Sequence, residues 1–157
     1  RFAKNINSDF QIINNKHFQK YFDILYQNTQ KFNSEPTHSF EEFRLLHNLF
    51  PEKIKTYCVL DKENKEVISG ITIFILNKIS VSGFYSTYNY SLGKEYLGSL
   101  KYSYWKLFKA LQLENYKFFN FGIDVRHGEL PNDGLRYFKD GFGGYQLNRS
   151  LYRLVNK

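Results

Sequence analysis

The stretch VISGITIFILNKISVSGFYSTY, residues 67–88, decides the fold. Apolar and polar side chains alternate on both sides of Asn77-Lys78, and β-branched and aromatic residues are dense, as in two strands joined by a tight turn. The segment 55–60 has the same composition and is followed by a polar turn beginning DKEN. Segments 55–60, 67–76 and 79–88 therefore predict a three-stranded antiparallel meander. Gly70, inside the second of these strands, predicts either a bulge or a close approach of another segment.

The sequence after the meander changes to a helical period. Apolar residues step by three and four positions along 93–113, which predicts an amphipathic helix. These residues are Leu97, Leu100, Tyr104, Leu107 and Leu111. Residues 116–123 are again apolar and aromatic and predict a strand. A strand, a helix and a strand in this order form a βαβ unit, so 116–123 is expected to lie parallel to 79–88 after a right-handed crossover.

The segment before the meander predicts one strand and two helices. A short apolar run at 10–13 predicts the strand, and from His17 onward apolar residues recur every three or four positions. This stripe consists of Phe18, Tyr21, Phe22, Leu25 and Phe32. The first helix is therefore expected to run for roughly four turns.

The second helix has a sharper start signal. Ser39 and Glu42 have the spacing of a capping box, in which each side chain binds the other residue's backbone N–H. Its expected buried face is Phe43, Leu46 and Phe50, and Pro51 ends it. His38 and His47 are then interpreted as a neighbour of the cap and a surface residue of this helix.

The C-terminal segment predicts one more helix and a last strand. Pro131 suits the first position of a helix that reaches about Asp140, and the glycines at 141–144 end it. Residues 145–155 then supply a strand or hairpin. The complete order predicts an α+β fold, a central mixed sheet with helices on both faces, in a single domain spanning 1–157.

The composition narrows the class of protein only slightly. The formal net charge of +7 and the pI near 9.4 permit anionic partners such as RNA, nucleotides or coenzymes, but the basic residues are dispersed as on an ordinary solvated surface. The single cysteine, Cys58, lies in the apolar run TYCVL and is expected to be a buried structural thiol. No apolar run approaches the length of a transmembrane helix, so no membrane span is expected. The histidine spacings do not predict a metal site.

Five segments of the chain resemble a known superfamily. They are PTHSFEEFRLLHNLFPEKIKTY, EVISGITIF, LGSL, FFNFGI and NDGLRYFKDGFGG, in that order and spacing. Together with the order of elements, they resemble the FemABX-like branch of the GNAT acyltransferase superfamily, and most closely its acetyltransferase-like group associated with cell-surface polysaccharides. The resemblance covers nearly the whole chain. Such proteins often carry two GNAT-like domains in tandem, and this chain is similar to the second, so it is expected to be the C-terminal half of a longer protein.

The resemblance implies N-acyl transfer in the cytoplasm of a bacterium. An amine of an amino sugar or a peptidoglycan-type precursor would attack an activated carbonyl, held where the meander's last strand and the next parallel strand splay apart. The donor would be acetyl-CoA or another acyl-CoA, with an aminoacyl-tRNA as the alternative. Such a reaction needs a group that accepts the amine proton, hydrogen-bond donors for the oxyanion and an acyl donor held in a fixed position.

Two residues carry the expected catalytic roles. Lys139, with Phe138, matches a Phe-Lys pair that the resemblance places in the reaction, and it could stabilise an oxyanion or neutralise a phosphate or carboxylate. A lysine in the last turn of a helix is also favoured by the helix dipole alone. Asp124 is expected directly after the strand 116–123, where a carboxylate could accept the amine proton or simply cap a loop.

Five further residues are expected to bind substrate, one of which is Phe138. His127 could act as a base or bind phosphate, although an exposed loop histidine is the simpler interpretation. Asn132 matches the family pattern and could bind substrate or cap a helix. Tyr85 and Tyr88 are expected on the cleft side of the third meander strand, where they could stack on a sugar or a base, or only pack between strands.

The expected cofactor-binding residues are Ser91, Gly93, Lys94 and Gly98. A GNAT coenzyme loop has the pattern R/Q-x-x-G-x-G/A at a helix start, where backbone N–H groups receive the pyrophosphate. Here the corresponding sequence is YSLGKE, with Glu95 in place of a small residue. This departure leaves open a second hypothesis, that the domain is non-catalytic and presents carbohydrate or RNA to an upstream GNAT-like domain. Binding of tRNA through the basic surface is a third.

Overall fold

The computed structural model describes residues 7–126 and 130–147, and it divides into two compact units, Arg1–Gly122 and Ile123–Lys157. Each unit is described by itself. The first contains one five-stranded sheet and three α-helices. The second contains a two-stranded hairpin and one short helix.

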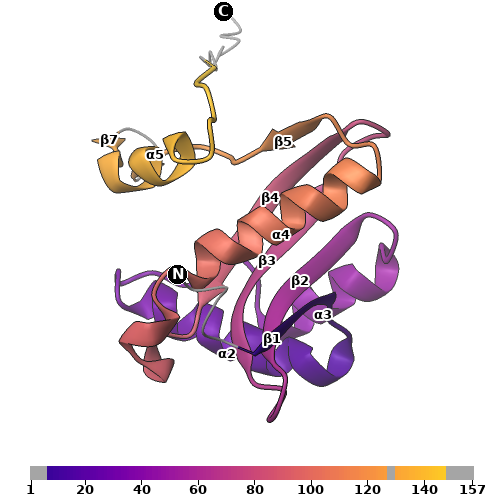
Figure 1. Cartoon of the computed structure of the whole chain (residues 1–157), viewed down its shortest axis with the longest axis vertical. Coiled ribbons are helices and arrows are strands. Elements are labelled where there is room, and N and C mark those ends of the chain that lie inside the picture. Colours follow the sequence, from indigo (N-terminus) through magenta and orange to yellow (C-terminus); the bar gives the residue numbers. More distant parts are fainter. Residues whose placement is uncertain (1–6, 127–129, 148–157) are drawn as a thin grey trace, which may run out of the picture. The chain divides into compact units, whose positions relative to one another are not determined.

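The sheet of the first unit has the strand order β1-β2-β3-β4-β5 (Figure 1). Its strands are β1 (Ser8–Ile12), β2 (Ile54–Asp61), β3 (Val67–Ile75), β4 (Ser80–Tyr88) and β5 (Phe118–Asn120). The first four run antiparallel to their neighbours, and β5 runs parallel to β4. The predicted meander, the parallel fifth strand and the mixed sheet are confirmed.

Helices cover both faces of this sheet, as the element order predicts (Figure 1). Ser69 and Gly70 are consecutive residues of β3 and therefore point to opposite faces. The Ser69 hydroxyl lies 2.7 Å from that of Ser103 in α4 (Ser99–Leu113). A Cβ atom on Gly70 would lie 2.8 Å from the ring of Tyr21 in α2 (Asn15–Gln30). Helices α4 and α2 thus lie on opposite faces.

The core on the α2 face is mainly aromatic. Phe18, Tyr21 and Phe22 of α2 pack their rings against Phe43 of α3 (Phe40–Leu49), at centroid distances between 5.5 and 5.9 Å. Burial of these large rings supplies the main driving force for closing the two helices onto the sheet. The expected stripe of α2 is wrong at Phe32, which follows the end of the helix and is 76% exposed. Phe50 is likewise exposed, because it is the C-cap of α3 and lies outside its buried face.

Gly70 makes room for that core. The sequence allowed a bulge or a close approach, and the register shift of β3 against β4 lies at Thr72/Ile73 instead. A side chain at Gly70 would collide with Tyr21 and also with Cys58, whose sulfur lies 2.5 Å from the Cβ position. Cys58 is fully buried, as expected, and burial raises the pKa of its thiol far above the ordinary value.

The capping box of α3 is present as predicted. Ser39 Oγ accepts a hydrogen bond from the Glu42 backbone N–H at 3.2 Å, and Glu42 Oε2 accepts one from the Ser39 N–H at 2.8 Å. We expect Ser39→Ala to lower the free energy of unfolding by about 1 kcal/mol, because it leaves a helix N–H without its acceptor. Urea denaturation measures the loss. Ser34→Ala, an exposed serine outside any helix, is the matched control and should change stability by less than about 0.5 kcal/mol.

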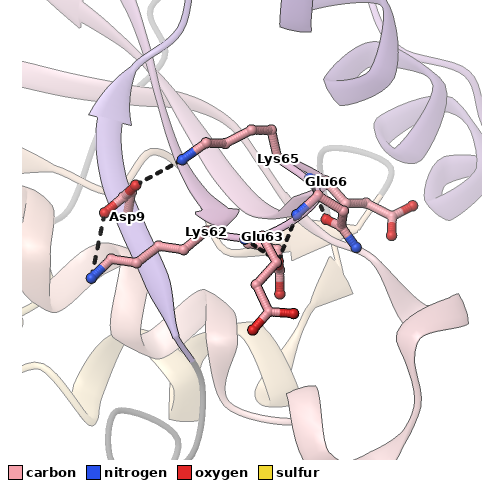
Figure 2. A network of polar contacts seen from close by, with 7 residues as sticks. Asp9, Lys62, Glu63, Lys65 and Glu66 are labelled. Atoms are coloured by element: carbon pink, nitrogen blue, oxygen red, sulfur yellow. Dashed lines mark hydrogen bonds and ion pairs between the residues drawn. The ribbon is translucent and has the colours of Figure 1, made fainter.

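An ion-pair cluster joins β1 to the β2–β3 turn (Figure 2). The Asp9 carboxylate lies 3.8 Å from Lys62 Nζ and 3.2 Å from Lys65 Nζ. Asp61 Oδ1 accepts hydrogen bonds from the backbone N–H groups of Glu63 and Asn64. Since these side chains are largely exposed, the ion pairs contribute little stability, and the turn geometry depends mainly on Asp61.

Helix α4 starts later than the period predicts, at Ser99 instead of residue 93. Two short 3-10 turns, Tyr90–Leu92 and Lys94–Tyr96, occupy the intervening segment. Gly93 and Gly98 have φ values of 100° and 96°, a left-handed region that an α-helix cannot include. Leu97, expected on the buried stripe, is therefore exposed.

Strand β5 is also shorter than the predicted 116–123 and contains only Phe118–Asn120. The Asn120 side-chain oxygen accepts a hydrogen bond from the Gly122 N–H at 2.8 Å, and Gly122 has a φ of 76°. This turn ends the strand. Asp124 consequently does not follow directly on the strand, and it belongs to the second unit.

The second unit contains β6 (Val125–Arg126), β7 (Leu130–Pro131) and α5 (Asp133–Asp140). Pro131 was expected at the first helical position, but it pairs with Val125 in the hairpin, which the sequence pattern did not predict. The helix begins after Asn132, whose side chain accepts a hydrogen bond from the Leu135 N–H at 3.1 Å. Residues 145–147 are not in a strand, and the rest of the expected last strand lies outside the described residues.

Candidate functional site

The most distinctive feature of the first unit is an opening between β4 and β5. The two strands pair only through Ser80 with Phe118, Val81 with Phe119 and Ser82 with Asn120. Strand β4 then continues to Tyr88, and no described strand pairs with its β5-side edge along 83–88. This edge can pair with an extended ligand, because unpaired strand edges present N–H and C=O groups in register. The sequence resemblance implied an opening between these two strands, and the structure shows that β5 ends at Asn120 while β4 continues to Tyr88.

The opening begins where β4 has a glycine and β5 has a turn. A Cβ atom at Gly83 would lie 3.0 Å from Phe119 Cζ, so a glycine there lets the ring of Phe119 lie against β4. Phe119 in turn packs on Phe108 and Phe121, with ring centroids 5.0 Å away in both cases. Beyond these rings the Asn120–Gly122 turn ends β5, and β4 continues to Tyr88 paired with β3.

A β-bulge lies in β4 at the start of the free edge. Thr72 is opposite Tyr85, and Ile73 is opposite Gly83, so Phe84 has no partner residue in β3. A bulge of this kind re-aims the neighbouring peptide groups and is common beside active sites. Phe84 is held by stacking on Phe74, with ring centroids 4.4 Å apart. The peptide groups around Phe84 and Tyr85 are thus fixed in a non-standard orientation at the opening.

His38 contacts Tyr85 beside this bulge. The Tyr85 hydroxyl accepts a hydrogen bond from the His38 backbone N–H at 3.1 Å and lies 3.0 Å from its Nδ1. The sequence interpretation of His38 as a mere neighbour of the helix cap missed this contact. The only sequence signal was its place in the loop directly before the capping box. Tyr85 was expected to be a binding residue on the cleft side of β4, and its position is consistent with that.

An open pocket of about 420 Å³ lies next to His38. The rings of Phe22, Tyr26 and Phe40 line it, together with Glu35. Aromatic walls with one carboxylate and one imidazole suit a small organic cation, because both the ring faces and the carboxylate attract positive charge. The pocket therefore has the chemistry of an amine-binding site.

A smaller pocket of about 180 Å³ lies at the end of β4, lined in part by Asn28, Tyr88 and Tyr90. Asn28 Nδ2 donates a hydrogen bond to the Tyr88 carbonyl at 2.8 Å, and Lys31 Nζ lies 3.5 Å from the centre of the Tyr90 ring. Tyr88 packs on Tyr90 with centroids 3.9 Å apart, so the packing interpretation of these tyrosines holds at least in part. Burial, with a smaller contribution from the neighbouring Tyr90, raises the pKa of Tyr88 to about 12. The Tyr88 hydroxyl is therefore neutral at neutral pH.

The start of α4 is the place where an anionic group could bind. Gly98 is the N-cap with a left-handed backbone, no side chain caps the helix, and a Cβ atom at Gly98 would meet nothing within 4 Å. Among the described residues, the buried Ser99 hydroxyl has no hydrogen-bond partner. Exposed N–H groups and an unpaired hydroxyl at a helix start fit a phosphate. The α-helix thus begins after Gly98 and not in the expected loop around Gly93, and the cofactor-binding role of these residues stays a prediction.

Of the other expected cofactor-binding residues, Ser91 has a local hydrogen-bond partner and Lys94 precedes the start of α4. Ser91 is held by Asn89, whose Oδ1 accepts hydrogen bonds from the Ser91 N–H at 3.0 Å and from its hydroxyl at 2.6 Å. Lys94 lies in the second 3-10 turn, close in sequence to Gly98. Of the predicted set, Gly98 is the residue that the helix geometry supports best.

The second unit brings Lys139 and Asp124 together with two other residues. Lys139 Nζ donates a hydrogen bond to the Ile123 carbonyl at 2.7 Å, and Gln146 Nε2 donates one to Asp124 Oδ2 at 2.9 Å. Partial burial lowers the pKa of Lys139, and the negative charge of Asp124 opposes that shift. Asn132 caps α5 as described, which was one of its two interpretations.

Phe138 packs on Phe142 with ring centroids 5.3 Å apart. His127 lies outside the described residues. Within residues 7–126 and 130–147 no group of three histidine, cysteine, aspartate or glutamate side chains could hold a metal ion. No helix in the same described ranges is long and apolar enough to cross a membrane.

Comparison with solved structures identifies the fold. No family model and no curated protein matches the sequence. A possible acetyltransferase from Clostridium difficile 630 superimposes with a TM-score of 0.72 and 10% identity, over 96% of this chain and 98% of that chain. The chain has the GNAT fold.

Two further GNAT-fold structures agree. The ribosomal-protein-alanine N-acetyltransferase from Brucella melitensis biovar Abortus 2308 has a TM-score of 0.64 and 8% identity, over 96% of this chain and 99% of that chain. AAC(6')-Iy, in complex with the bisubstrate analogue CoA-S-monomethyl-acetylneamine, has a TM-score of 0.64 and 10% identity over the same shares. The mixed sheet with its opening beside β4 is thus the GNAT sheet, while the FemABX-like branch rests on the sequence segments alone.

Proposed function

We propose that this chain is a GNAT-type N-acyltransferase that transfers an acyl group to an amine. The observation that carries the proposal is the free edge of β4 along 83–88, next to a bulge and to the His38–Tyr85 pair. The free edge of β4 can hold an extended acyl donor, and the adjacent His38–Tyr85 pair can accept a proton from the amine. These are the two requirements of direct acyl transfer.

The residues present fit an acyl-CoA donor. When bound, the coenzyme would supply an activated thioester carbonyl. The N–H and C=O groups along 83–88 would pair with its amide-containing arm, as an edge strand pairs with an added strand. The N–H groups after Gly98 and the Ser99 hydroxyl would hold its phosphates. The sequence feature that opposes this is Glu95, which stands where the family pattern has a small residue.

His38 is the proposed proton acceptor for the amine. The Tyr85 oxygen has two lone pairs, so it can accept from both the His38 backbone N–H and Nδ1–H. In that tautomer Nε2 is unprotonated and can take the proton of an amine in the pocket beside it. A neutral histidine has a basicity suited to this step near neutral pH.

The proposed acceptor is an amine of an amino sugar or a peptidoglycan-type precursor. The sequence resemblance to the polysaccharide-associated FemABX-like group supports it, as does the aromatic pocket with Glu35. The bisubstrate analogue bound to AAC(6')-Iy shows that one GNAT-fold neighbour accommodates a CoA-linked neamine derivative. A cytoplasmic location, an upstream GNAT-like domain and an aminoacyl-tRNA as alternative donor are further proposals with the same sequence basis.

We also propose that Lys139 and Asp124 take part in transfer. Lys139→Ala and Asp124→Ala are each expected to lower kcat/KM by about 10-fold or more, the effect of losing one charged contact to the reacting groups. Thermal unfolding should change only slightly in both variants, since both side chains are half-buried and their hydrogen bonds join parts of one small unit. Activity in an assay of the intact protein checks this, with Lys117→Ala as the control lysine. Full activity in both variants would show that this pair has no catalytic role.

A second candidate function is a non-catalytic domain that presents carbohydrate or RNA to a partner domain. Glu95 in the coenzyme loop favours it, because the side chain replaces the small residue that lets a pyrophosphate approach. The net charge of +7 would favour RNA among such ligands. Binding of tRNA that does not weaken between low and physiological salt would exclude an electrostatic RNA site.

A transfer assay tests the proposed function. The purified chain is mixed with acetyl-CoA and a panel of amines comprising glucosamine, a lysine-containing peptide and an aminoglycoside, and free thiol release is followed. The proposal predicts thiol release that depends on the amine and is lost on mixing with hydroxyl analogues of the same compounds. Release that is independent of amine, or none with any amine despite donor binding, would contradict it.

A further inference from the structure

The pocket beside His38 carries a negative charge that pairs with no basic side chain of the described ranges. Glu35 lines this pocket, and the described lining residues include no lysine or arginine. Within the part of the chain that the structure describes, the ion pairs belong to the Asp9 cluster and do not include Glu35 (Figure 2). Lys31, the basic residue nearest to Glu35 in the sequence, lies over the Tyr90 ring, with its Nζ 3.5 Å from the ring centre. The Glu35 carboxylate is therefore available to a cationic ligand.

The segment that carries Glu35 is held on both sides. Before it, the Ser34 carbonyl accepts a hydrogen bond from Gln30 Nε2 at 3.4 Å. After it, Pro36 fixes its own φ and disfavours a helical backbone at Glu35. The His38 backbone N–H then donates to a side-chain hydroxyl of β4 at 3.1 Å. A carboxylate on a segment held in this way binds a ligand with a smaller loss of conformational freedom than one on an unattached loop.

Aromatic rings make up much of the pocket wall. Phe22 and Tyr26 lie about one turn apart on α2 and therefore on the same face of the helix. The ring of Phe22 packs on that of Phe40, with centroids 5.7 Å apart, whereas Tyr26 is 43% exposed and offers its ring to a ligand. Ring faces and a carboxylate attract the same positively charged group. The pocket is thus suited to hold an ammonium group between Glu35 and the aromatic wall.

The pocket has room for more than the reacting amine. Its volume of about 420 Å³ is many times the roughly 30 Å³ that a group of the size of water occupies. Glu35 and His38 are three residues apart, so their Cα atoms are separated by at most about 11 Å. One small molecule can therefore contact both side chains at once.

The two side chains suit different protonation states of nitrogen. The nitrogen that attacks the acyl carbon must be neutral, because its lone pair forms the new bond. A carboxylate next to an amine favours the protonated form, so Glu35 beside the attacking nitrogen would oppose the reaction. A nitrogen that does not react has no such limit and is stabilised by the carboxylate. Glu35 is therefore suited to an ammonium group, and His38 to the attacking amine.

We propose that the acceptor has two amino groups and that Glu35 selects it: one nitrogen reacts beside His38, while the other stays protonated between the Glu35 carboxylate and the ring of Tyr26. The proposal rests on the proposed function, because it assumes that transfer occurs beside His38. The second nitrogen takes no part in the bond changes, so the reaction balance is that of transfer to a monoamine. Linear diamines and amino sugars with a second amino group share this chemistry.

The acetyl-CoA transfer assay on the intact chain measures the selection. The probes are 1,5-diaminopentane and 5-aminopentan-1-ol, which differ only in whether the second group is an amine or a hydroxyl. The ratio of their kcat/KM values per reactive amine is expected to be about 10 or more in the parent, as for one charge-assisted contact, and to fall to within about two-fold of unity in Glu35→Gln. The change should lie mainly in KM, because the second nitrogen binds away from the reacting atoms.

A matched control shows whether the effect belongs to this carboxylate. Glu41 is an exposed glutamate in the first turn of α3 and does not line the pocket. Glu41→Gln removes the same charge from the protein and should keep the parent ratio. Since Glu35 is also exposed, circular dichroism should show the parent fold in both variants.

A second pair of compounds distinguishes the two sources of such an acceptor. Glucosamine is an amino sugar with one amino group, and neamine is an aminoglycoside with several. A preference for neamine over glucosamine that Glu35→Gln removes, without a preference for the linear diamine, assigns the site to amino sugars with a second amine. The converse result assigns it to linear diamines. Both results support selection by Glu35.

Nuclear magnetic resonance on the full chain tests the contact without reference to activity. Addition of 1,5-diaminopentane should shift the amide resonances of Glu35, Thr37 and His38 saturably. The affinity should be weaker by about five-fold or more in Glu35→Gln and unchanged in Glu41→Gln. Glu35→Asp, which keeps the charge, should retain part of the affinity.

The outcomes separate this proposal from the proposed function. Equal kcat/KM values within both pairs of compounds in the parent would overturn selection by Glu35 while transfer itself stands, and so would a preference that persists in Glu35→Gln. Binding of the diamine at Glu35 without transfer to any amine would refute the proposed function and the selective role together, and would leave only a cation-binding pocket.

Discussion

The His38→Gln variant is expected to lose about 100-fold in kcat/KM for acyl transfer, and Tyr85→Phe about 10-fold. His38 is the proposed base beside the free edge of β4, and glutamine keeps the backbone N–H that binds Tyr85 while it removes the basic nitrogen. The Tyr85 hydroxyl only orients the imidazole, so its loss is expected to cost less than loss of the base.

The control for this prediction is a variant of another histidine in the first unit. His17→Gln removes another histidine of the first unit and should leave kcat/KM within about two-fold, as expected for a residue remote from the chemistry. Circular dichroism should show the same folded state in all three variants, because His38 lies at a pocket wall and Tyr85 is only partly buried at the edge of the core. An unchanged kcat/KM in His38→Gln would exclude it as the base and would return that role to Asp124.

The Gly70→Val variant is expected to lose about 3 kcal/mol or more of unfolding free energy. Its Cβ alone would lie 2.5 Å from the sulfur of Cys58 and 2.8 Å from the ring of Tyr21, both fully buried, so two packed side chains would have to move. Displacement of Tyr21 also breaks the hydrogen bonds of its hydroxyl with Thr72 and with the Tyr85 carbonyl. Urea unfolding measures the loss, and Gly70→Ala should show a smaller part of it.

Gly134→Ala is the matched control for the glycine series. Gly134 lies in the first turn of α5, where a Cβ atom would meet only Asn132 Oδ1 at an ordinary 3.7 Å. Alanine in a helix stabilises by about 0.5–1 kcal/mol relative to glycine. A Gly70→Val protein as stable as the parent would mean that α2 does not pack on β3 as described.

The sequence predicted the elements whose signals are local. The alternation in 67–88, the capping box at Ser39 and Glu42 and the apolar period of 99–113 each depend on neighbours within a few residues, and each is confirmed. The predicted start of α4 was wrong. The apolar period continues back to Leu97, and it does not show that Gly98 adopts a left-handed backbone.

The candidate site could be predicted only in part. The strand pattern placed Tyr85 in the third meander strand, and the family resemblance placed it beside the cleft. His38 was missed because its partner lies 47 residues away, and a contact at that separation depends on how the α2–α3 loop lies on the sheet. His47 was expected on the surface of α3 but is buried one helical turn after Phe43. A histidine on an apolar face does not itself show burial, and its hydrogen-bond partner Thr56 lies in β2, outside the helix.

Titration of the intact chain with acetyl-CoA by calorimetry tests the central claim most directly. The claim is that the free edge of β4 and the start of α4 form a donor site. It predicts saturable binding of one equivalent with a dissociation constant on the order of micromolar, weakened at least ten-fold in Gly98→Asp, which places a carboxylate where the phosphates would bind. Heat that does not saturate at millimolar acetyl-CoA, or equal affinity in Gly98→Asp, would contradict it.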